Sequence, residues 1–281
     1  MFVDLHSHTT ASDGSTPPRV LVQLAREKGL AALAISDHDT TDALDEAISA
    51  GLEFGVEVIP AVEMSTDVPA GEVHILGYFI SYHNEPLQSL LSTLREARLG
   101  RARKMVEKLA ALGMPLSWDR VQSFAGDGSV GRPHVAKAMV EKGYVSDIKT
   151  AFDLYINRNG PAYVERYKLT PAEAVQTIRR VGGLAVLAHP LEGNGSLHLL
   201  PELVAAGLGG VECYYTGYKP DVVATLTQTA GKYGLVPSGG SDFHGEGVAA
   251  NAFLGQPPVP YSVLEAMKAL HRQQQAASSK Q

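Results

Sequence analysis

Two histidines stand two residues apart in the first apolar run of this 281-residue sequence, which opens "MFVDLHSH". In a strand, residues two apart face the same side, so the rings of His6 and His8 would point the same way. For a single histidine beside a strand, a hydrogen-bonded core residue is the better interpretation. For a His-x-His pair, metal ligation explains the pattern about as well, because imidazole is a common metal ligand.

The same residue types recur where other apolar runs end. The further candidates are His38 in "AISDHD", Glu63 in "VIPAVEMS", His189 in "LAVLAHP", Asp242 and His244 in "GGSDFH", and Asp13 in the turn "TTASDG". In a (β/α) barrel the carboxyl ends of the strands form one face, so residues far apart in the chain would meet there. Burying so many ionisable side chains without partners would cost free energy of folding. A cluster of divalent metals would offset this cost, because each of these side chains could serve as a ligand. Nitrogen and oxygen ligands without thiolate suit Zn²⁺, Mn²⁺ or Fe²⁺.

Short apolar runs alternate with helical patterns along most of the chain. The runs expected to be strands are residues 1–8, 30–39, 56–66, 73–80, 184–190, 209–215 and 235–244, and the expected helices are 16–29, 41–55, 171–182, 197–206, 219–231 and 261–272. Such alternation is typical of parallel βαβ units, and this number of units indicates a closed or nearly closed α/β barrel.

Residues 86–165 interrupt the alternation, because they contain helical patterns and no convincing strand. The helical patterns cover 86–112, 117–124, 133–142 and 147–156. We interpret the segment as a helical insertion that covers the active site, with residues 1–85 and 166–275 forming the metal-binding barrel and 276–281 a polar tail. The alternative is that these are ordinary helices of the outer ring.

The bulk composition limits the class of partner. A net charge of −6 and a pI near 5.9 argue against a surface that binds duplex DNA. A small anionic substrate is compatible with this charge, because bound divalent metals reverse it locally. Cys213 is the single cysteine, so neither an intrachain disulfide nor a thiolate-based zinc site is expected. No stretch is long and apolar enough to span a membrane, and the N-terminus lacks a signal-peptide pattern, so we expect a cytoplasmic protein without membrane contact.

Two arginines interrupt the apolar face of the helix expected at 86–112. That face is formed by Leu87, Leu91, Leu94, Met105, Leu109 and Leu112. Arg98 and Arg101 take the positions that would continue it in the middle of the helix. Cations on an inward face suggest a cavity that holds an anion, and Arg132 in "GRPH" supports this, since guanidinium groups bind phosphate well. The alternative is that Arg98 and Arg101 pair with nearby carboxylates such as Glu96.

The ordered motifs "HSH", "SDG", "DHD", "VE", "GRPH", "AHP" and "SDFH" resemble those of the PHP (polymerase and histidinol phosphatase) family of metal-dependent phosphoesterases. The resemblance implies a distorted (β/α)7 barrel with two or three divalent metals, Mn²⁺ being expected and Zn²⁺ or Fe²⁺ the alternatives. One implied site uses His6, His8, Glu63 and Asp242; a second shares Glu63 and adds His74 and His134; a third uses Asp13, His38 and His244. Asp13 stands where some family members have histidine, which would alter the metal preference of the third site.

The helical segment, with "GRPHVAKAMVEKGYV", is most similar to the subgroup of nucleoside 3′,5′-bisphosphate phosphatases, whose relatives act as 5′-to-3′ exoribonucleases on short RNA. The resemblance implies hydrolysis of the 3′-phosphate of a nucleoside 3′,5′-bisphosphate to give the 5′-monophosphate. A metal-bridging hydroxide would attack phosphorus, and His189 would protonate the leaving oxygen or hold the phosphate. The residues expected to contact the nucleotide are Asp13, His38, Arg98, Arg101, Arg132, His134 and His189. The alternatives are a 5′-to-3′ exoribonuclease, a histidinol-phosphate phosphatase and, least in keeping with the complete ligand set, a non-catalytic PHP module.

Overall fold

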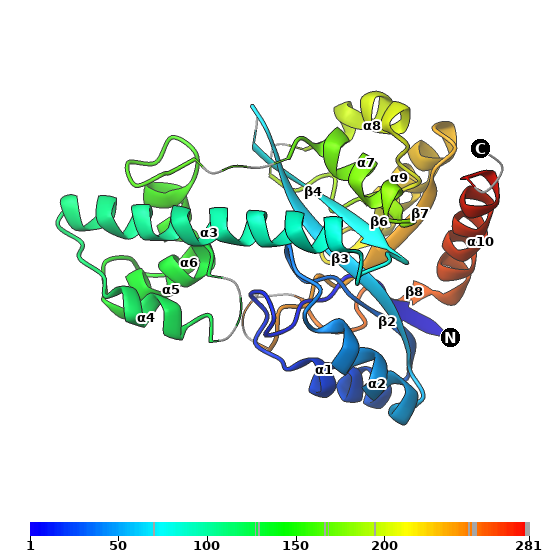
Figure 1. Ribbon diagram of the computed structural model, residues 1–281, viewed down its shortest axis with the longest axis horizontal. Coiled ribbons are helices and arrows are strands. Elements are labelled where there is room, and N and C mark those ends of the chain that lie inside the picture. Colours follow the sequence, from blue (N-terminus) through cyan, green and yellow to red (C-terminus); the bar gives the residue numbers. More distant parts are fainter. Residues whose placement is uncertain are drawn as a thin grey trace.

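The protein is built around one eight-stranded sheet (Figure 1). The computed structural model describes residues 1–69, 71–126, 128, 130–165, 167, 169–193, 195–246, 248 and 252–278. The strands are β1 (Phe2–Asp4), β2 (Leu30–Ile35), β3 (Glu57–Val68), β4 (Gly71–Tyr78), β5 (Leu184–Leu187), β6 (Gly210–Tyr215), β7 (Val236–Gly240) and β8 (Val259–Pro260). Their order across the sheet is β7-β6-β5-β4-β3-β2-β1-β8, so β1 to β7 follow one another in sequence order and β8 lies beside β1.

The sheet curls into a nearly closed barrel because the chain around β1 meets the chain around β7. The Leu5 amide donates to the Gly239 carbonyl at 3.1 Å, and the His8 amide donates to the Phe243 carbonyl at 2.9 Å. Most of the residues in these bonds lie just after the ends of β1 and β7. The two bonds therefore close the barrel, although β1 and β7 do not form a regular pair of strands. The predicted α/β barrel is thereby confirmed.

Two strands depart from the parallel pattern that alternating strands and helices predict, and one of them, β8, pairs antiparallel with β1 at the edge of the sheet. β1, β2 and β3 pair in parallel, as do β5, β6 and β7, but β4 is antiparallel to both β3 and β5. β3 and β4 form a hairpin, with Val68 paired to Gly71 at its tip. Strands joined by so short a connection must run antiparallel, because a parallel pair needs a long crossover. This reversal distorts the barrel.

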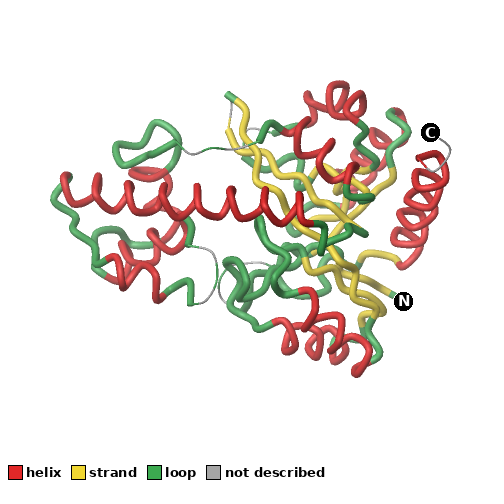
Figure 2. Tube along the Cα trace, viewed as in Figure 1, coloured by secondary structure: helices red, strands yellow, loops and turns green. Residues whose placement is uncertain are grey.

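Helices cover the outside of the barrel (Figure 2). They are α1 (Pro18–Glu27), α2 (Leu44–Phe54), α7 (Pro171–Arg180), the 3-10 turn η2 (Leu197–Leu199), α8 (Leu200–Ala206), α9 (Pro220–Lys232) and α10 (Tyr261–Ser278). Thr170 and Glu173 form a capping box at the start of α7. α10 continues to Ser278, past the end expected at residue 272. None of the helices in the described ranges is long and apolar enough to cross a membrane.

Residues 85–156 form a group of helices at one side of the barrel. These are α3 (Glu85–Ala111), α4 (Trp118–Ser123), α5 (Arg132–Glu141), α6 (Ile148–Ala151) and the π-helical turn η1 (Phe152–Ile156). α3 starts next to the barrel and extends away from it, and α4, α5 and α6 lie along its far half (Figure 1). These helices share a hydrophobic cluster that includes Met105, Val135 and Ile156. That residues 86–165 are an insertion distinct from the barrel stays a prediction.

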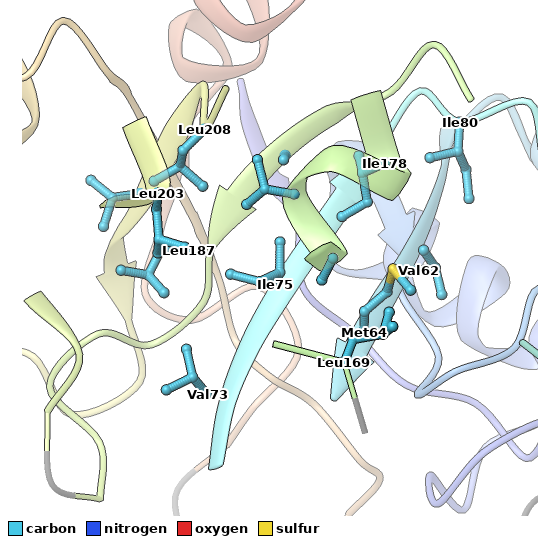
Figure 3. Packing of buried hydrophobic residues seen from close by; sticks show 14 of the residues in the cluster. Val62, Met64, Val73, Ile75, Ile80, Leu169, Ile178, Leu187, Leu203 and Leu208 are labelled. Carbon is cyan, nitrogen blue, oxygen red and sulfur yellow. The ribbon is translucent and has the colours of Figure 1, made fainter. Parts of the chain in front are cut away.

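The alternation of side chains along β4 separates two hydrophobic clusters. Ile75 packs with Ile178 of α7 on the outer face of the sheet (Figure 3). Tyr78 belongs to the other cluster, and its hydroxyl donates to the Leu5 carbonyl across the barrel at 2.8 Å. His74 shares this inner face, because residues two or four apart on a strand point the same way. The packing of β4 therefore directs one candidate ligand into the barrel.

Candidate metal centre

Four side chains meet, two of them just after β1, one just after β7 and one within β3. Glu63 is the one within β3, which continues to Val68, so it does not stand at the end of its strand as expected. The Nε2 atoms of His6 and His8 lie 3.4 and 3.2 Å from Glu63 Oε2, and 3.3 and 3.1 Å from Asp242 Oδ1. Both histidine rings are fully buried. Ser7, between them, points the other way and donates to a carbonyl oxygen of β2 at 2.7 Å. The alternation assumed from the sequence therefore continues past the end of β1 and brings both rings to the same place.

These four residues present unsatisfied atoms to one another. In the described part of the chain, His6 Nε2, both ring nitrogens of His8, Glu63 Oε2 and Asp242 Oδ1 are buried without a hydrogen-bond partner. Each such orphaned atom costs on the order of 1–3 kcal/mol. A divalent cation among them would satisfy the group, and two imidazoles with two carboxylates are a donor set that suits Mn²⁺, Fe²⁺ or Zn²⁺. The arrangement therefore fits a metal.

A second group gathers around Asp13. It comprises His8, Asp13, His38 and His244, whose ligand atoms all lie within 4.8 Å of one another. His244 Nε2 lies 3.3 Å from Asp13 Oδ1. The turn that carries Asp13 is anchored by Asp37, whose carboxylate accepts hydrogen bonds from the Thr9 amide at 2.8 Å and from the hydroxyls of Thr9 and Ser12. A buried carboxylate thus fixes the position of a candidate ligand in a loop.

Glu63 links the first group to a third, which comprises His38, Glu63 and His74. His38 Nδ1 lies 3.0 Å from Glu63 Oε2, and His74 Nδ1 lies 2.9 Å from Glu63 Oε1. The Oε1 atom also lies 3.1 Å from His189 Nε2. The two oxygens of Glu63 therefore face different sets of histidines, so that this carboxylate could serve as a ligand in both groups.

His134, expected beside His74, lies outside these three groups. Its ring is buried at the start of α5, and its Nδ1 accepts a hydrogen bond from the Gly131 amide at 3.0 Å. Burial lowers the pKa of His134 to about 4. In a neutral ring whose Nδ1 is an acceptor, Nε2 carries the proton, which suits contact with an anion better than ligation of a metal. Both predicted roles of His134 stay predictions.

Three carboxylates, that of the buried Glu63 and those of the partly buried Asp13 and Asp242, concentrate negative charge among the histidines. Burial raises the pKa of each carboxylate, but the surrounding histidines outweigh burial and hold all three pKa values well below the usual range. In turn, Asp13 and Asp242 overcome the effect of burial on His244 and raise its pKa to about 10. At His38 burial prevails and lowers the pKa to about 3. An ionised carboxylate cluster of this density attracts divalent cations.

The three arginines expected to bind phosphate each pair with a carboxylate of the barrel. Arg98 Nε donates to Asp39 Oδ2 at 2.7 Å, and both side chains are buried. Arg101 Nη1 lies 3.3 Å from Glu72 Oε1, and Arg132 pairs with the other oxygen of Glu72. The carboxylate pairing considered as the alternative for Arg98 and Arg101 is therefore present, although the partners lie on the barrel and not on α3 itself. Contact of these arginines with a substrate stays a prediction.

A cleft of about 450 Å³ opens beside the cluster, between the barrel and the group of helices. Its lining includes His74 and His189, whose ring centres lie 5.1 Å apart. Arg132 and Arg158 also line it, and Arg158 pairs with Asp67 of the β3–β4 hairpin. The cleft therefore combines candidate metal-site histidines with guanidinium groups that can bind phosphate oxygens.

Glu212 is a functional candidate that sequence reasoning missed. Its carboxylate is fully buried on β6, and its Oε1 lies 3.0 Å from His6 Nδ1. The sequence carries a signal for it, because an acidic residue within the apolar run "GGVECYY" has to find a buried partner. Asp37 is a second missed residue, with the same kind of signal in "AISDHD".

The barrel and its three ligand groups define a metal-dependent phosphoesterase. Residues 4–117 match the model of the PHP domain. Together with the relatives described next, this match shows that the chain belongs to the PHP family and that the protein is an enzyme.

Relatives of this chain are named for different phosphoesterase activities, among them the following two. The chain is 36% identical over 245 residues to the 5′-3′ exoribonuclease of Haemophilus influenzae, with 86% of this chain and 89% of that protein covered. It is 34% identical over 250 residues to the 3′,5′-nucleoside bisphosphate phosphatase of Chromobacterium violaceum, with 87% and 88% covered. A crystal structure from Bifidobacterium adolescentis, assigned to the metal-dependent phosphoesterases, matches with a TM-score of 0.85 and 32% identity over 94% of both chains. The predicted family is confirmed.

Proposed function

We propose that the protein removes the 3′-phosphate from nucleoside 3′,5′-bisphosphates and leaves 5′-monophosphates. The observation that carries the proposal is the cleft, whose lining includes His74 and His189 together with Arg132 and Arg158. A substrate with two phosphates can put one against the metal-site histidines and the other on a guanidinium, since arginine binds phosphate oxygens in a forked geometry. The similarity to a 3′,5′-nucleoside bisphosphate phosphatase supports this substrate class.

The proposed metal ligands enclose the reacting phosphate on the barrel side of the cleft. They are His6, His8, Asp13, His38, Glu63, His74, Asp242 and His244, while His134, whose Nδ1 already accepts a hydrogen bond from the Gly131 amide, is proposed to contact the phosphate instead. Two or three divalent cations, with Mn²⁺ expected, would neutralise phosphoryl oxygens and activate the attacking water when bound. The side chains fix where those charges lie before substrate arrives, and such prepositioned charges stabilise a phosphoryl transition state without reorganisation.

His189 is proposed to protonate the leaving oxygen. Its Nε2 lies 3.1 Å from Glu63 Oε1, so the ring reaches the cluster although it is a member of none of the three ligand groups. Its φ of 24° lies in the left-handed region that residues other than glycine rarely adopt. His189→Asn should lower kcat and leave the Mn²⁺ content unchanged. Loss of a metal in this variant would make His189 a ligand and remove it from the proton transfer.

The proposal is tested by offering three substrates in parallel to the Mn²⁺-loaded protein. They are adenosine 3′,5′-bisphosphate, histidinol phosphate and a short 5′-phosphorylated RNA. Adenosine 5′-monophosphate and inorganic phosphate as products of the first substrate would support the proposal. Formation of adenosine 3′-monophosphate, or phosphate release from histidinol phosphate alone, would overturn it.

A 5′-to-3′ exoribonuclease is the second candidate, because the chain is similar to the Haemophilus influenzae enzyme over most of both lengths. Stepwise release of mononucleotides from the 5′ end of the RNA would identify this activity. The larger kcat/KM, on the bisphosphate or on the RNA, decides between the two candidates.

Arg132→Ala tests the argument that the cleft holds two phosphates. If the Arg132 guanidinium binds the phosphate that does not react, KM for adenosine 3′,5′-bisphosphate should rise roughly 10- to 100-fold, the value of one charge-assisted hydrogen bond. KM for a nucleoside 3′-monophosphate should change little. Arg120→Ala is the matched control, since Arg120 belongs to the same group of helices, pairs with the exposed Glu141 and is absent from the described lining of the cleft. An equal rise for both substrates would contradict the argument.

A further inference from the structure

Strand β6 supplies none of the proposed metal ligands, yet two of its side chains reach them. Glu212 Oε1 lies 3.0 Å from His6 Nδ1, and the Tyr215 hydroxyl donates to Asp242 Oδ2 at 2.9 Å. The other atoms of the same two groups, His6 Nε2 and Asp242 Oδ1, lie 3.3 Å apart within the first ligand group. Glu212 and Tyr215 therefore bind the sides of His6 and Asp242 that face away from the candidate metal.

A β-bulge explains how both residues reach the site. Residues three apart on a regular strand point to opposite faces, so Glu212 and Tyr215 should not share one. The pairing of β6 with β7 shifts between Glu212 and Tyr214, where β6 advances by two residues and β7 by one, with Cys213 as the extra residue. Such a bulge re-aims the side chains that follow it. One strand therefore presents two polar side chains to the same cluster.

Glu212 also holds a second group with its other oxygen. Glu212 Oε2 accepts a hydrogen bond from the His189 amide at 2.7 Å. That residue has the left-handed φ of 24°, a conformation that costs on the order of 1–3 kcal/mol and persists only where the surroundings hold it. A single buried carboxylate thus fixes both His6 and the turn that carries His189.

We propose that Glu212 and Tyr215 are positioning residues of the metal centre. Glu212 keeps His6 Nδ1 engaged so that Nε2 faces the metal, and Tyr215 turns Asp242 so that Oδ1 does the same. The inference rests on the proposed metal centre and not on the identity of the substrate. A carboxylate that accepts a hydrogen bond from a ligand histidine orients the ring and makes it a stronger donor, and losing such a partner typically weakens metal binding 10- to 100-fold.

The affinity of the full chain for Mn²⁺, measured by competition with a chelator, tests the inference without any substrate. Glu212→Gln keeps the size of the side chain and removes its charge, and should weaken the tightest site roughly 10- to 100-fold. Tyr215→Phe should weaken it by a smaller factor. Tyr214→Phe is the matched control on the same strand, because Tyr214 packs against the hydrophobic clusters and should leave the affinity unchanged. Circular dichroism checks that each variant is folded.

A double-mutant cycle separates positioning from a general loss of stability. In a His6→Ala background, Glu212→Gln should cause no further loss of Mn²⁺ affinity, because Glu212 acts on the metal through His6. The inference would be overturned if Glu212→Gln bound Mn²⁺ as tightly as the wild type does. It would also be overturned if Glu212→Gln weakened Mn²⁺ binding in the His6→Ala background by the same factor as in the wild type. If Glu212→Gln does not fold, the Mn²⁺ affinity of Tyr215→Phe is compared with that of Tyr214→Phe. A weaker affinity in Tyr215→Phe alone is then the expected result, because only Tyr215 contacts a proposed ligand, Asp242. A wild-type protein that binds no Mn²⁺, Zn²⁺ or Fe²⁺ would overturn the metal centre and this inference with it.

Discussion

The buried ion pair between Arg98 and Asp39 joins α3 to the loop that follows His38. Arg98 Nε lies 2.7 Å from Asp39 Oδ2, and the two side chains are 9% and 0% exposed. Asp39 also accepts a hydrogen bond from the Ser65 amide at 3.0 Å. Arg98→Met keeps much of the length of the side chain and removes its charge. The carboxylate of Asp39 would then stay buried without this counter-charge.

Removing one partner of a buried ion pair costs about 3–5 kcal/mol. In a chain of this length each kcal/mol lowers Tm by roughly 2–4 °C, so Arg98→Met should lower Tm by on the order of 10 °C. Arg120→Met is the control, because Arg120 and Glu141 form a pair at 2.6 Å whose side chains are 47% and 43% exposed. An exposed pair contributes about 0–1 kcal/mol, and the control should lose at most about 4 °C.

Thermal unfolding followed by circular dichroism measures both losses, and urea unfolding gives the free energies. Adding Asp39→Asn to Arg98→Met should cost much less than the sum of the two single changes, because the second change removes the uncompensated charge. Equal losses of Tm in Arg98→Met and Arg120→Met would refute the reasoning, since burial would then have no influence on the energy of the pair.

Three further predictions concern the metals and one helix cap. Asp13→Ala should remove one metal, seen by elemental analysis, and leave the site of His6 occupied; loss of every metal would contradict separate sites. Mn²⁺ at about 100 times its Kd should raise the free energy of unfolding by about 2.7 kcal/mol, and EDTA should reverse this, because only the folded chain brings the ligands together; an unchanged Tm would count against the metal centre. The amide and hydroxyl of Thr170 donate to Glu173 and hold its pKa below the usual range. The lowered pKa means that ionised Glu173 stabilises the fold above its unfolded pKa of about 4.3, and that this contribution is lost as the pH falls through the folded-state pKa. Because Glu173 is an exposed anion in the first turn of α7, Glu173→Ala should cost about 0.3–1 kcal/mol at pH 7 and progressively less under acid conditions. Urea unfolding at pH 7 and below pH 4 checks this, and an equal loss at both would contradict it.

The clustering of the first ligand group could be predicted from the sequence for two simple reasons. His6 and His8 follow the period of a strand, which continues past the end of β1, and this needs only local geometry. Asp242 joins them because the carboxyl ends of barrel strands converge, which is a property of the topology. Each step depends on a rule that holds whatever the detailed packing is.

Other parts of the site depend on tertiary placement that leaves no local pattern. The partners of Arg98 and Arg101 are set by where α3 crosses the barrel, and the charged residues of α3 itself give no hint of Asp39 or Glu72. The role of Glu212 depends on a bulge, which changes the face to which a strand residue points. The antiparallel direction of β4 follows from the short hairpin that precedes it, and not from its apolar pattern.

The seam where the barrel closes joins residues from the two ends of the chain. His6 and Asp242, which belong to the same ligand group, are separated by 236 positions (242 − 6). At a synthesis rate of roughly 5–20 residues per second, Asp242 emerges about 12 to 47 s after His6. The growing chain therefore exposes His6 and His8 for this interval with no complete coordination sphere. Filling of the first ligand group must therefore follow the synthesis of nearly the whole barrel, whereas the ligands of the third group, His38, Glu63 and His74, are all present after residue 74.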